Sequence, residues 1–562
     1  MTRKKAHTPQ VAPTTHHEET APKPKNRTPF LQTPKGKFLP YALTFIGLWI
    51  FCAVTYGDVF SRTVQESFVT SDAELMKHLT DQDYGQLYLF GRYLLLVFHQ
   101  PWLGGLCLSL LLTAATFFLD YAFRIPQWLR GISALLPFGF LFTVAQQGVS
   151  LFYKNEPSLF VLQATGLFLL AAILALISRI FLNKKVSGAS ASSPKSWRHG
   201  SWGTLVVALS FAGLEYYAHD VRQNTILTAK MQNSILNNEI ADLIEEGLKA
   251  EQPTRSVAAY YTIGLLQTHQ LLEHVFDISF HFPKEKMASN EGIGEYGIFT
   301  ADCNFYAGLL NSSYRSAMDQ IVMNGPRLYY LKRIALCAIL NQEKVLANKY
   351  LTLIGKVPFE KDFVDTYAPM VDHPELIQQN ASFAQVLSLY PVEQRFEQNY
   401  RSPAFLGYNI GMMEGNNASL APSMAACMYS KDLPNLALRA MQYKRIYGSL
   451  PLSVQEALSI HARKHPDLYQ YFPELNEAQL RLPNPANTNV NNFYLSIQEH
   501  FQQKYHGAQD WRERMGKELK EGISEDLRKL IIRDWKGHYV YYYYCENINQ
   551  AKEDKQESSG VN

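Results

Sequence analysis

The amino-acid sequence predicts an all-α membrane protein in two parts, a bundle of about five transmembrane helices followed by a domain of stacked helical hairpins. Three observations lead to this fold class. Every apolar stretch of membrane-spanning length lies before residue 219. Beyond that point apolar residues recur at helical spacing, and the alternation typical of strands is nearly absent. Lys and Arg gather in the loops on one side of the apolar stretches, as in multi-pass proteins.

The composition separates the two parts and excludes some classes of function. Of the 562 residues, 18% are charged and 13% are aromatic, whereas ordinary soluble domains carry about 25% charged residues. The mean hydropathy of −0.16 averages a strongly apolar region, 38–218, with an ordinary one, 219–562. A net charge of +3 argues against a nucleic-acid partner. The six cysteines contain no C-x-x-C pair, which argues against a zinc or redox motif and leaves one or two disulfides open.

The apolar stretches define the predicted boundaries. Residues 1–37 are polar and basic and are predicted to be a disordered cytoplasmic tail, and the polar segment 547–562 is predicted to be a second disordered tail. The transmembrane domain is predicted over 38–218, with spans near 38–56, 102–123, 132–153, 159–181 and 202–218. Between the first two spans lies a polar, acidic loop, 57–85. The apolar stretch 86–99 carries Arg92 and is too short to span, so we expect an interfacial helix there.

The positions of the basic residues set the predicted orientation. On the side of the N-terminus are Arg3, Lys4, Lys5, Lys23, Lys25, Arg27, Lys35, Lys37, Arg124, Arg130, Lys184, Lys185, Lys195 and Arg198. The opposite side has only Arg62, Lys77 and Lys154, with Arg92 near the interface. Because cytoplasmic loops carry the excess of Lys and Arg, the N-terminus is predicted to be cytoplasmic and the domain 219–546 extracytoplasmic. In a Gram-negative bacterium the chain would lie in the inner membrane, with this domain in the periplasm.

Three segments of the second part are predicted to be helical hairpins that end at a proline. They are Ser256–Gln267 with Leu271–Phe280 before Pro283, Pro326–Leu340 with Lys344–Ile354 before Pro358, and Leu420–Tyr429 with Leu433–Tyr447 before Pro451. The second pair resembles a tetratricopeptide repeat, because Leu336, Leu340 and Ala347 take packing positions of that motif and Pro358 closes the unit. The alternative to a solenoid of this kind is an α-helical domain without repeats.

An aromatic run near the C-terminus has two interpretations. It reads Trp535-Lys-Gly-His-Tyr-Val-Tyr-Tyr-Tyr-Tyr-Cys545. Such a run can form a platform for a ligand. It can also be the buried face of a closing helix, packed against the domain or placed at the membrane interface, where tyrosine is favoured. We favour the closing helix.

The sequence contains few patterns that point to chemistry, and none that predicts a cofactor. No G-x-G-x-x-G, H-E-x-x-H or G-x-S-x-G motif occurs. His461 and His465 are spaced so that both rings fall on one helix face, which two metal ligands would need. They enclose Arg463 and Lys464, whose charge repels a cation, so a solvated basic helix end is the better interpretation.

One constellation supports an enzyme hypothesis. Asp81 and Asp83 lie in the first outside loop, shortly before Arg92. Polytopic sugar transferases that use lipid-linked donors have acidic residues in this loop, where a carboxylate can bind a metal or deprotonate an acceptor. Gln146 and Gln147 in the third predicted span could line the same cavity. Such enzymes have more spans than this chain, and a solvated acidic loop explains the same residues.

Several short stretches together resemble a family of polytopic bacterial membrane proteins, domain of unknown function 6057, found in Bacteroidetes-type bacteria. They are Asp83-Tyr-Gly-Gln-Leu-Tyr-Leu-Phe90, Pro101-Trp-Leu-Gly-Gly105, the helix pair Tyr260–Phe280, the hairpin Tyr329–Pro358 and the closing Gly537-His-Tyr-Val-Tyr-Tyr-Tyr543. The chain departs from the expected pattern at Tyr84-Gly85-Gln86, where a Glu-Gln pair would stand. The resemblance implies an inner-membrane protein with a repeat-like periplasmic domain and implies no activity.

The sequence therefore favours a scaffold over an enzyme. The expected partners are the lipid bilayer and other envelope proteins or peptides, bound by the helical domain, because stacked hairpins form extended surfaces without catalytic residues. The alternatives are a divergent, reduced relative of polytopic membrane glycosyltransferases, with Asp81, Asp83 and Arg92 as its site, and an accessory subunit of a transporter.

Overall fold

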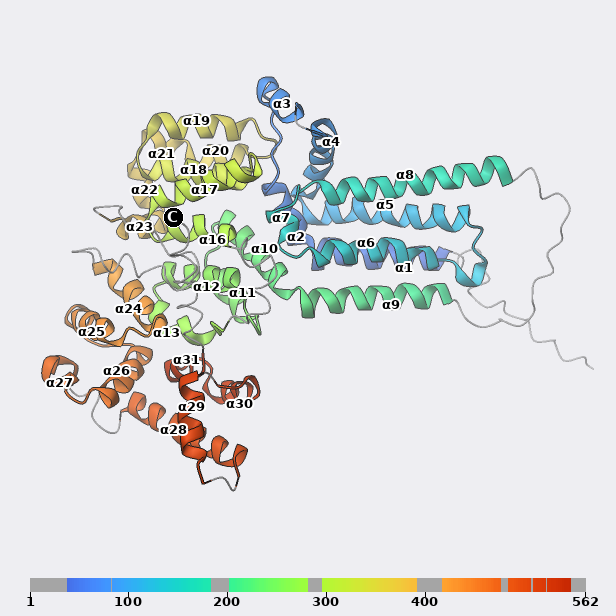
Figure 1. Ribbon diagram of the computed structural model, residues 1–562. Helices are drawn as coiled ribbons and strands as arrows, with labels where there is room; N and C mark the ends of the chain where they lie inside the picture. Colours follow the sequence, from blue (N-terminus) through green and yellow to red (C-terminus); the bar gives the residue numbers. More distant parts are fainter. Residues whose placement is uncertain are drawn as a thin grey trace, which may run out of the picture.

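The computed structural model describes residues 38–81, 83–182, 202–281, 296–391, 417–476, 484–506, 509–521 and 523–546. All regular secondary structure in these ranges is helical. The helices form an elongated bundle with a broader helical domain attached to one of its ends (Figure 1). The all-α fold class is therefore confirmed for the described ranges. The predicted tails, 1–37 and 547–562, and most of the basic loop 182–200 lie outside them.

The described residues of the first part form nine α-helices. They are α1 (Leu39–Ile50), α2 (Gly57–Gln65), α3 (Ala73–Thr80), α4 (Gly85–Leu95), α5 (Pro101–Ala122), α6 (Leu135–Gln146), α7 (Ser150–Tyr153), α8 (Leu159–Ile177) and α9 (Trp202–Tyr216). Helices α1, α5, α6, α8 and α9 run along the bundle, and α2, α3, α4 and α7 lie at the end that meets the helical domain (Figure 1).

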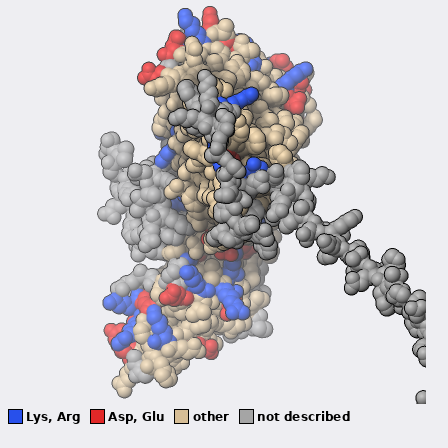
Figure 2. Space-filling model, turned by 90° about the vertical axis from the view of Figure 1, so that its right-hand side faces the viewer, with Lys and Arg blue, Asp and Glu red and all other residues tan. Residues whose placement is uncertain are grey.

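Membrane association is indicated by the length and composition of these helices. Among the described residues, Pro101–Ala122 and Leu159–Ile180 are long and apolar enough to cross a membrane. The bent pair Leu39–Thr55 and Gly57–Gln65 adds a third if it counts as one span, and Ile132–Gln146 is apolar but shorter. Viewed from the free end of the bundle, charged side chains gather over the two extremes of the helical domain, and the described surface between them is mostly uncharged (Figure 2).

The first predicted span does not lead into a solvated loop. After α1 the backbone widens into a π-helical turn at Phe51–Thr55, and α2 leaves at an angle of 58°. Such local widening is a common cause of kinks. Helix α2 then buries Val59, Phe60 and Val64 in the core. The expectation of a polar loop over 57–85 is therefore wrong for its first third, which is a buried helix.

Close packing and one buried carboxylate hold the bundle together. A Cβ atom added to Gly105 on α5 would lie 2.7 Å from Cβ of Ala53, so glycine allows the two backbones to approach. At the opposite end of α5, the buried carboxylate of Asp120 accepts hydrogen bonds from Tyr41 Oη (2.8 Å) and from the backbone N–H of Gly131 (2.7 Å). The first bond ties α1 to α5, and the second fixes the loop that follows α5.

The helical domain follows without a break. Its first half contains α10 (Gln223–Leu236), α11 (Asp242–Leu248), α12 (Arg255–Gln267), α13 (Leu271–His274), α16 (Tyr296–Tyr306), α17 (Leu310–Asn324), α18 (Leu328–Leu340), α19 (Lys344–Gly355), α20 (Lys361–Tyr367), α21 (Pro369–Asp372), α22 (Glu375–Gln379) and α23 (Ala381–Ser388). Its second half contains α24 (Leu420–Tyr429), α25 (Leu433–Tyr447), α26 (Leu452–Lys464), α27 (Leu468–Tyr471), α28 (Pro485–Lys504), α29 (Trp511–Glu521), α30 (Glu525–Trp535) and α31 (Tyr539–Cys545).

Five helix pairs in the described part of this domain share one turn geometry. In α10–α11, α12–α13, α16–α17, α18–α19 and α24–α25, one residue of the turn is left-handed: Asn238 (φ 61°), His269 (60°), Gly308 (77°), Gln342 (58°) and Lys431 (57°). The next N–H in each turn donates to the carbonyl five residues earlier, at 2.8–2.9 Å. This is the Schellman arrangement, which satisfies the last carbonyls of a helix. Only one of these five turns has glycine at the left-handed position, so the sequence alone does not reveal the repeated geometry.

Two of the three predicted hairpins are present in the structure. The second and third are confirmed as helix pairs, α18–α19 and α24–α25, that pack against each other. In the first, α12 is followed only by the four-residue α13, and α12 packs mainly against α10, α11 and α16 instead. Pro283, expected to end that hairpin, lies outside the described residues. The pair α16–α17 was not anticipated.

Candidate functional site

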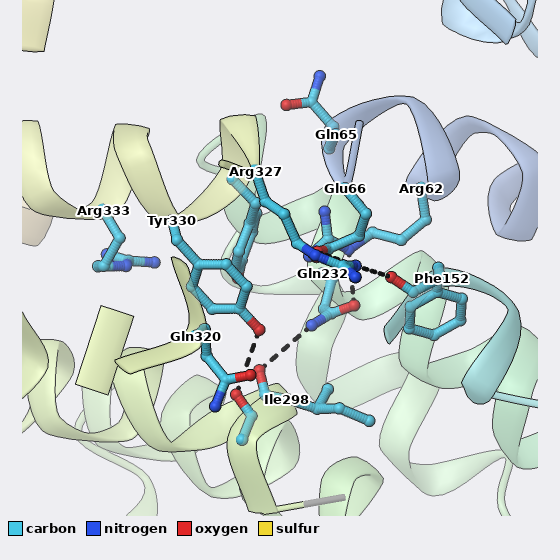
Figure 3. Close-up of polar contacts among 12 residues, drawn as sticks. Arg62, Gln65, Glu66, Phe152, Gln232, Ile298, Gln320, Arg327, Tyr330 and Arg333 are labelled. Atoms are coloured by element: carbon cyan, nitrogen blue, oxygen red, sulfur yellow. Dashed lines mark hydrogen bonds and ion pairs between the residues drawn. The ribbon is translucent and has the colours of Figure 1, made fainter. Parts of the chain in front are cut away.

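Charged side chains are buried where the bundle meets the helical domain. We call this group the junction network; its members are Arg62, Gln65, Glu66, Gln232, Tyr260, Asp302, Arg327, Tyr329, Lys332, Arg333 and Glu360. None of them is more than 9% exposed. Figure 3 shows part of the network, with side chains converging from the first and second parts of the chain.

The first cluster joins α2 to the helical domain. Arg62 and Glu66 lie one helical turn apart and form an ion pair. Nε of Arg62 donates to Oε1 of Gln232 on α10 (2.7 Å). Nη1 of Arg327 donates both to Oε2 of Glu66 (3.1 Å) and to the carbonyl oxygen of Phe152 on α7 (3.1 Å; Figure 3). Two segments of the bundle are thus connected to the start of α18.

The second cluster is centred on the fully buried Asp302 of α16. Its carboxylate accepts hydrogen bonds from Tyr260 Oη (2.9 Å), from Arg333 Nη2 (2.6 Å) and from Tyr329 Oη (2.5 Å). Nε2 of Gln232 donates to Oη of Tyr260 (2.8 Å) and so links this cluster to the first. Helices α10, α12, α16 and α18 are thereby joined by one set of polar contacts.

The third cluster lies beside the first. Nζ of Lys332 on α18 lies 2.6 Å from Oε2 of Glu360 and donates to Oε1 of Gln65 (3.0 Å). The amide of Gln65 also donates to Oε1 of Glu360 at the longer distance of 3.4 Å. The end of α2 is thus bound to the segment that precedes α20.

Pairing offsets the cost of burying these charges. Arg62, Arg327, Lys332 and Arg333 are cationic, and Glu66, Asp302 and Glu360 are their carboxylate partners. Removing a charge from water costs several kcal/mol unless partners replace the solvent. Two of the guanidinium groups also lie over aromatic rings, Arg62 at 3.8 Å from the centre of Tyr329 and Arg333 at 4.2 Å from that of Phe305.

The network fixes protonation states. Burial raises the pKa of Tyr260 and that of Tyr329 well above the ordinary value, and the charge of Asp302 adds to this effect. Both phenols therefore remain hydrogen-bond donors. Burial opposes the charge of Arg333, but Asp302 outweighs it and raises the pKa of the guanidinium. Burial lowers the pKa of Lys332, and Glu360 opposes this shift.

This arrangement suits a structural joint better than a reaction centre. The carboxylates already accept hydrogen bonds or ion pairs from protein donors, and every member is shielded from solvent. Within the described ranges no group of three or more His, Cys, Asp or Glu side chains is placed to hold a metal ion. The network therefore holds the helical domain in one orientation on the bundle.

The residues of the enzyme hypothesis are not assembled into a site. Asp81 and Asp83 are exposed in the turn between α3 and α4, and their carboxylates have no partner within the described ranges. Arg92 on α4 instead forms a two-bond ion pair with Glu156, from Nε to Oε1 and from Nη2 to Oε2, both 2.8 Å. Glu156 precedes α8, so this contact fastens α4 to the bundle.

The remaining sequence candidates have structural roles. The Gln147 side chain accepts a hydrogen bond from Asn155 (2.8 Å), and the Gln146 carbonyl accepts one from Arg222 (2.6 Å). The rings of His461 and His465 lie 4.9 Å apart, and burial lowers the pKa of His461. All six cysteines are free thiols, so neither of the disulfides left open by the sequence is present.

The aromatic run forms a buried closing helix, as the sequence favoured. Tyr539 and Tyr542 of α31 are at most 6% exposed, and the ring of Phe276 lies 5.1 Å and 4.7 Å from theirs. Nζ of Lys431 donates to the carbonyls of Tyr543 (2.7 Å) and Glu546 (2.8 Å) at the end of this helix. The last helix is thereby fixed to α24 and to the segment after α13.

Sequence reasoning missed the junction network because its members were assigned to loops or to unspecified helices. A signal was present: Arg62 and Glu66 are four residues apart, among Val59, Phe60 and Val64. That spacing predicts an amphipathic helix with an internal ion pair. Their partners, more than 160 residues away along the chain, carry no local signal.

The fold and the junction together define a class: an α-helical membrane-associated protein with a large helical domain firmly attached to its bundle. The model of a protein family described as "Family of unknown function (DUF6057)" matches residues 33–214 and 144–546 of the chain. The chain belongs to this family, which confirms the resemblance seen in its short motifs. No curated protein and no solved structure matches the chain.

Proposed function

We propose that this protein is a scaffold of the bacterial envelope, anchored in the membrane, whose helical domain binds protein or peptide partners. The junction network is the observation that carries the proposal. It fixes a large helical domain relative to the bundle with buried ion pairs, and it offers no accessible reaction centre. Stacked helical hairpins, of which a tetratricopeptide-like solenoid is one form, expose extended surfaces that suit such binding.

The proposed topology has five spans in the inner membrane, a cytoplasmic N-terminus and a periplasmic helical domain. It is supported by the five helices that run along the bundle and by the apolar side chains they expose: Leu110, Phe117, Leu169, Leu170, Ile173 and Leu209. The excess of Lys and Arg in loops on one side supports the orientation. A periplasm-dependent phosphatase fused after Gln267 should be active. An inactive fusion, with an active cytoplasmic reporter at the same position, would overturn the topology.

Site-specific photo-crosslinking in native membranes tests the binding role. A photoreactive residue would replace Val345 on α19 or Tyr471 on α27, whose side chains are 87% and 74% exposed. We expect discrete protein adducts, identified by mass spectrometry and reproduced by crosslinking from the partner. Leu170 on α8, 55% exposed, is the control and should give lipid adducts. Absence of protein adducts from both domain positions, at normal protein level, would count against the scaffold.

The transferase alternative needs Asp81 or Asp83 to act on a substrate, and both carboxylates are exposed with no partner in the described ranges. Arg92 is already engaged by Glu156. These contacts favour the scaffold, and an accessory role beside a transporter is a special case of it.

A further inference from the structure

A small pocket lies beside the junction network, between α4 with its 3-10 extension (Leu96–His99) and the segment after α19. Its polar lining residues include Ser67, Arg92, His99 and Glu360, and much of the remaining lining is apolar, including Leu95 and Val357. Its empty volume, mouth included, is about 310 Å³, and the enclosed part has room for about one water molecule.

The polar groups of the pocket are ordered by depth. Ser67 and Glu360 are 6% and 4% exposed and form the recess, whereas the Arg92 side chain is 16% exposed and His99 lies at the surface. Oγ of Ser67 is buried without a hydrogen-bond partner in the described structure. The recess therefore offers a carboxylate and an unused hydroxyl. The mouth offers the imidazole of His99 and Nη1 of Arg92, the guanidinium nitrogen that does not take part in the pair with Glu156.

The ion pairs around the pocket leave one hydrogen-bond acceptor position of Glu360 free for a ligand. Oε2 of Glu360 is held by Lys332 at 2.6 Å, but Oε1 has only the long contact of 3.4 Å with Gln65. A carboxylate oxygen accepts two hydrogen bonds, so Oε1 has a free position. Arg92 and Glu156 neutralise each other, as do Lys332 and Glu360, and the pocket is close to neutral overall. A neutral pocket with separated charges suits a zwitterion.

The other face of α4 points to the source of the ligand. Leu87, Phe90 and Tyr93 are 51%, 53% and 49% exposed, and Trp102 at the start of α5 is 56% exposed. Helix α4 packs against α8, so this apolar face lies beside the end of the bundle that meets the helical domain (Figure 1). An amphipathic helix of this kind lies at the boundary between headgroups and acyl chains. The pocket behind α4 is then at the depth of lipid headgroups.

We propose that this pocket binds the phosphoethanolamine headgroup of a membrane lipid. The primary ammonium group occupies the recess and donates to Glu360 Oε1 and Ser67 Oγ, and the phosphate lies at the mouth beside Arg92 and His99. A primary ammonium is about the size of a water molecule and fits the recess, whereas the trimethylammonium of choline is too large and has no N–H to donate. The proposal rests on the membrane placement given above and is independent of the scaffold role.

Lipid retention by the full chain tests this inference. The protein is reconstituted in vesicles of equimolar phosphatidylethanolamine, phosphatidylcholine and phosphatidylglycerol, extracted in mild detergent and measured by native mass spectrometry. We expect one phosphatidylethanolamine per chain, retained about tenfold over the other two, which corresponds to one charge-assisted bond. Excess soluble glycerophosphoethanolamine should not replace it, because the acyl chains contribute to binding; replacement would overturn the lipid source.

Two variants locate the site. Ser67→Leu fills the recess and should abolish the preference while leaving the Lys332–Glu360 pair in place. His99→Gln removes the imidazole at the mouth, together with its stacking on Phe359 at 4.7 Å, and should weaken retention several-fold. His373→Gln at an exposed position of the helical domain is the control for loss of an imidazole. Equal retention of the three lipids, or an unchanged preference in both pocket variants, overturns the inference alone. Failure to enter vesicles of any composition overturns the membrane placement with it.

Discussion

The junction network and the closing segment 535–546 both hold distant parts of the chain together, but they use different interactions. Each fastens a piece of chain to helices that are distant in sequence. The junction uses buried charges, such as Asp302 with Arg333 at 2.6 Å. The closing segment uses packed tyrosine rings, with ionisable groups at both ends of α31. Lys431, from the turn after α24, donates to carbonyls at the end of the helix, and Nδ1 of His538, before its start, lies 2.8 Å from Oε1 of Glu456.

The difference lies in exposure to solvent protons. The junction groups are almost completely shielded, and their pKa shifts keep the phenols neutral and Arg333 charged. At the closing segment, burial lowers the pKa of Lys431 to about 8, and the hydrogen bond that His538 donates to Glu456 raises the pKa of this half-buried imidazole. We therefore expect the junction to be sensitive to mutation and insensitive to pH near neutrality, and the closing segment to respond to both.

The largest effect should follow from breaking the junction. Asp302→Asn removes the carboxylate that pairs with Arg333 and leaves a buried, uncompensated cation, which costs about 3–5 kcal/mol. Thermal unfolding of the full chain in detergent measures the loss. Asp365→Asn on the exposed face of α20 is the matched control and should stay within about 0.5 kcal/mol of wild type. Equal unfolding temperatures for the two variants would contradict a structural role for the network.

A smaller effect is expected at the end of the closing helix. The Glu546 carboxylate accepts hydrogen bonds from Ser279 Oγ (2.6 Å) and the Phe280 N–H (2.8 Å). Glu546→Gln keeps the shape but loses the charge of the acceptor, and bonds to charged groups contribute about 1.5–3 kcal/mol. Limited proteolysis should cut α31 sooner in this variant while cleavage of the bundle is unchanged. An unaltered cleavage pattern would show that the aromatic packing alone holds the helix.

The closing segment should loosen as pH rises from 6 toward neutrality. Because the pKa of His538 is raised in the folded state, its contribution is fully present below about pH 6.5, the value of a free imidazole, and is lost as pH rises through the folded pKa. Hydrogen exchange of α31 amides should therefore be slower at pH 6 than at pH 7, after correction for intrinsic exchange. This window lies below the lowered pKa of Lys431, about 8, where loss of the lysine charge adds stability and offsets the effect of His538. His538→Gln should remove the difference between pH 6 and pH 7, and protection of α16 and α18 should not change.

The smallest effect should come from the acidic turn before α4. Asp81→Asn combined with Asp83→Asn alters two exposed carboxylates and should change stability by less than about 0.5 kcal/mol. The host carrying this double variant should resemble wild type in any phenotype that deletion of the protein produces. A phenotype equal to the deletion, at normal protein level, would favour the transferase, since loss of a general base costs about 10²–10⁴-fold in rate.

Features that depend on residues close together in the sequence could be predicted, whereas contacts between distant residues could not. The hairpins α18–α19 and α24–α25 were found because helical spacing and turn residues are local signals. The closing helix was found because an aromatic run has few alternatives to burial. The pair Arg92–Glu156 was missed, because the two residues come from different helical segments and each alone is an ordinary interfacial charge.

The sequence by itself determined the all-α class, the division into an apolar and an ordinary part, and the family, because these depend on composition, periodicity and short motifs. Only the tertiary structure decided which charges are buried. A 58° bend after α1 brings Arg62 and Glu66 against Arg327, 261 residues beyond Glu66. Burying a charge costs several kcal/mol unless partner groups replace the lost solvent. Because those partners come from distant parts of the chain, only the complete fold determines which charges can be buried.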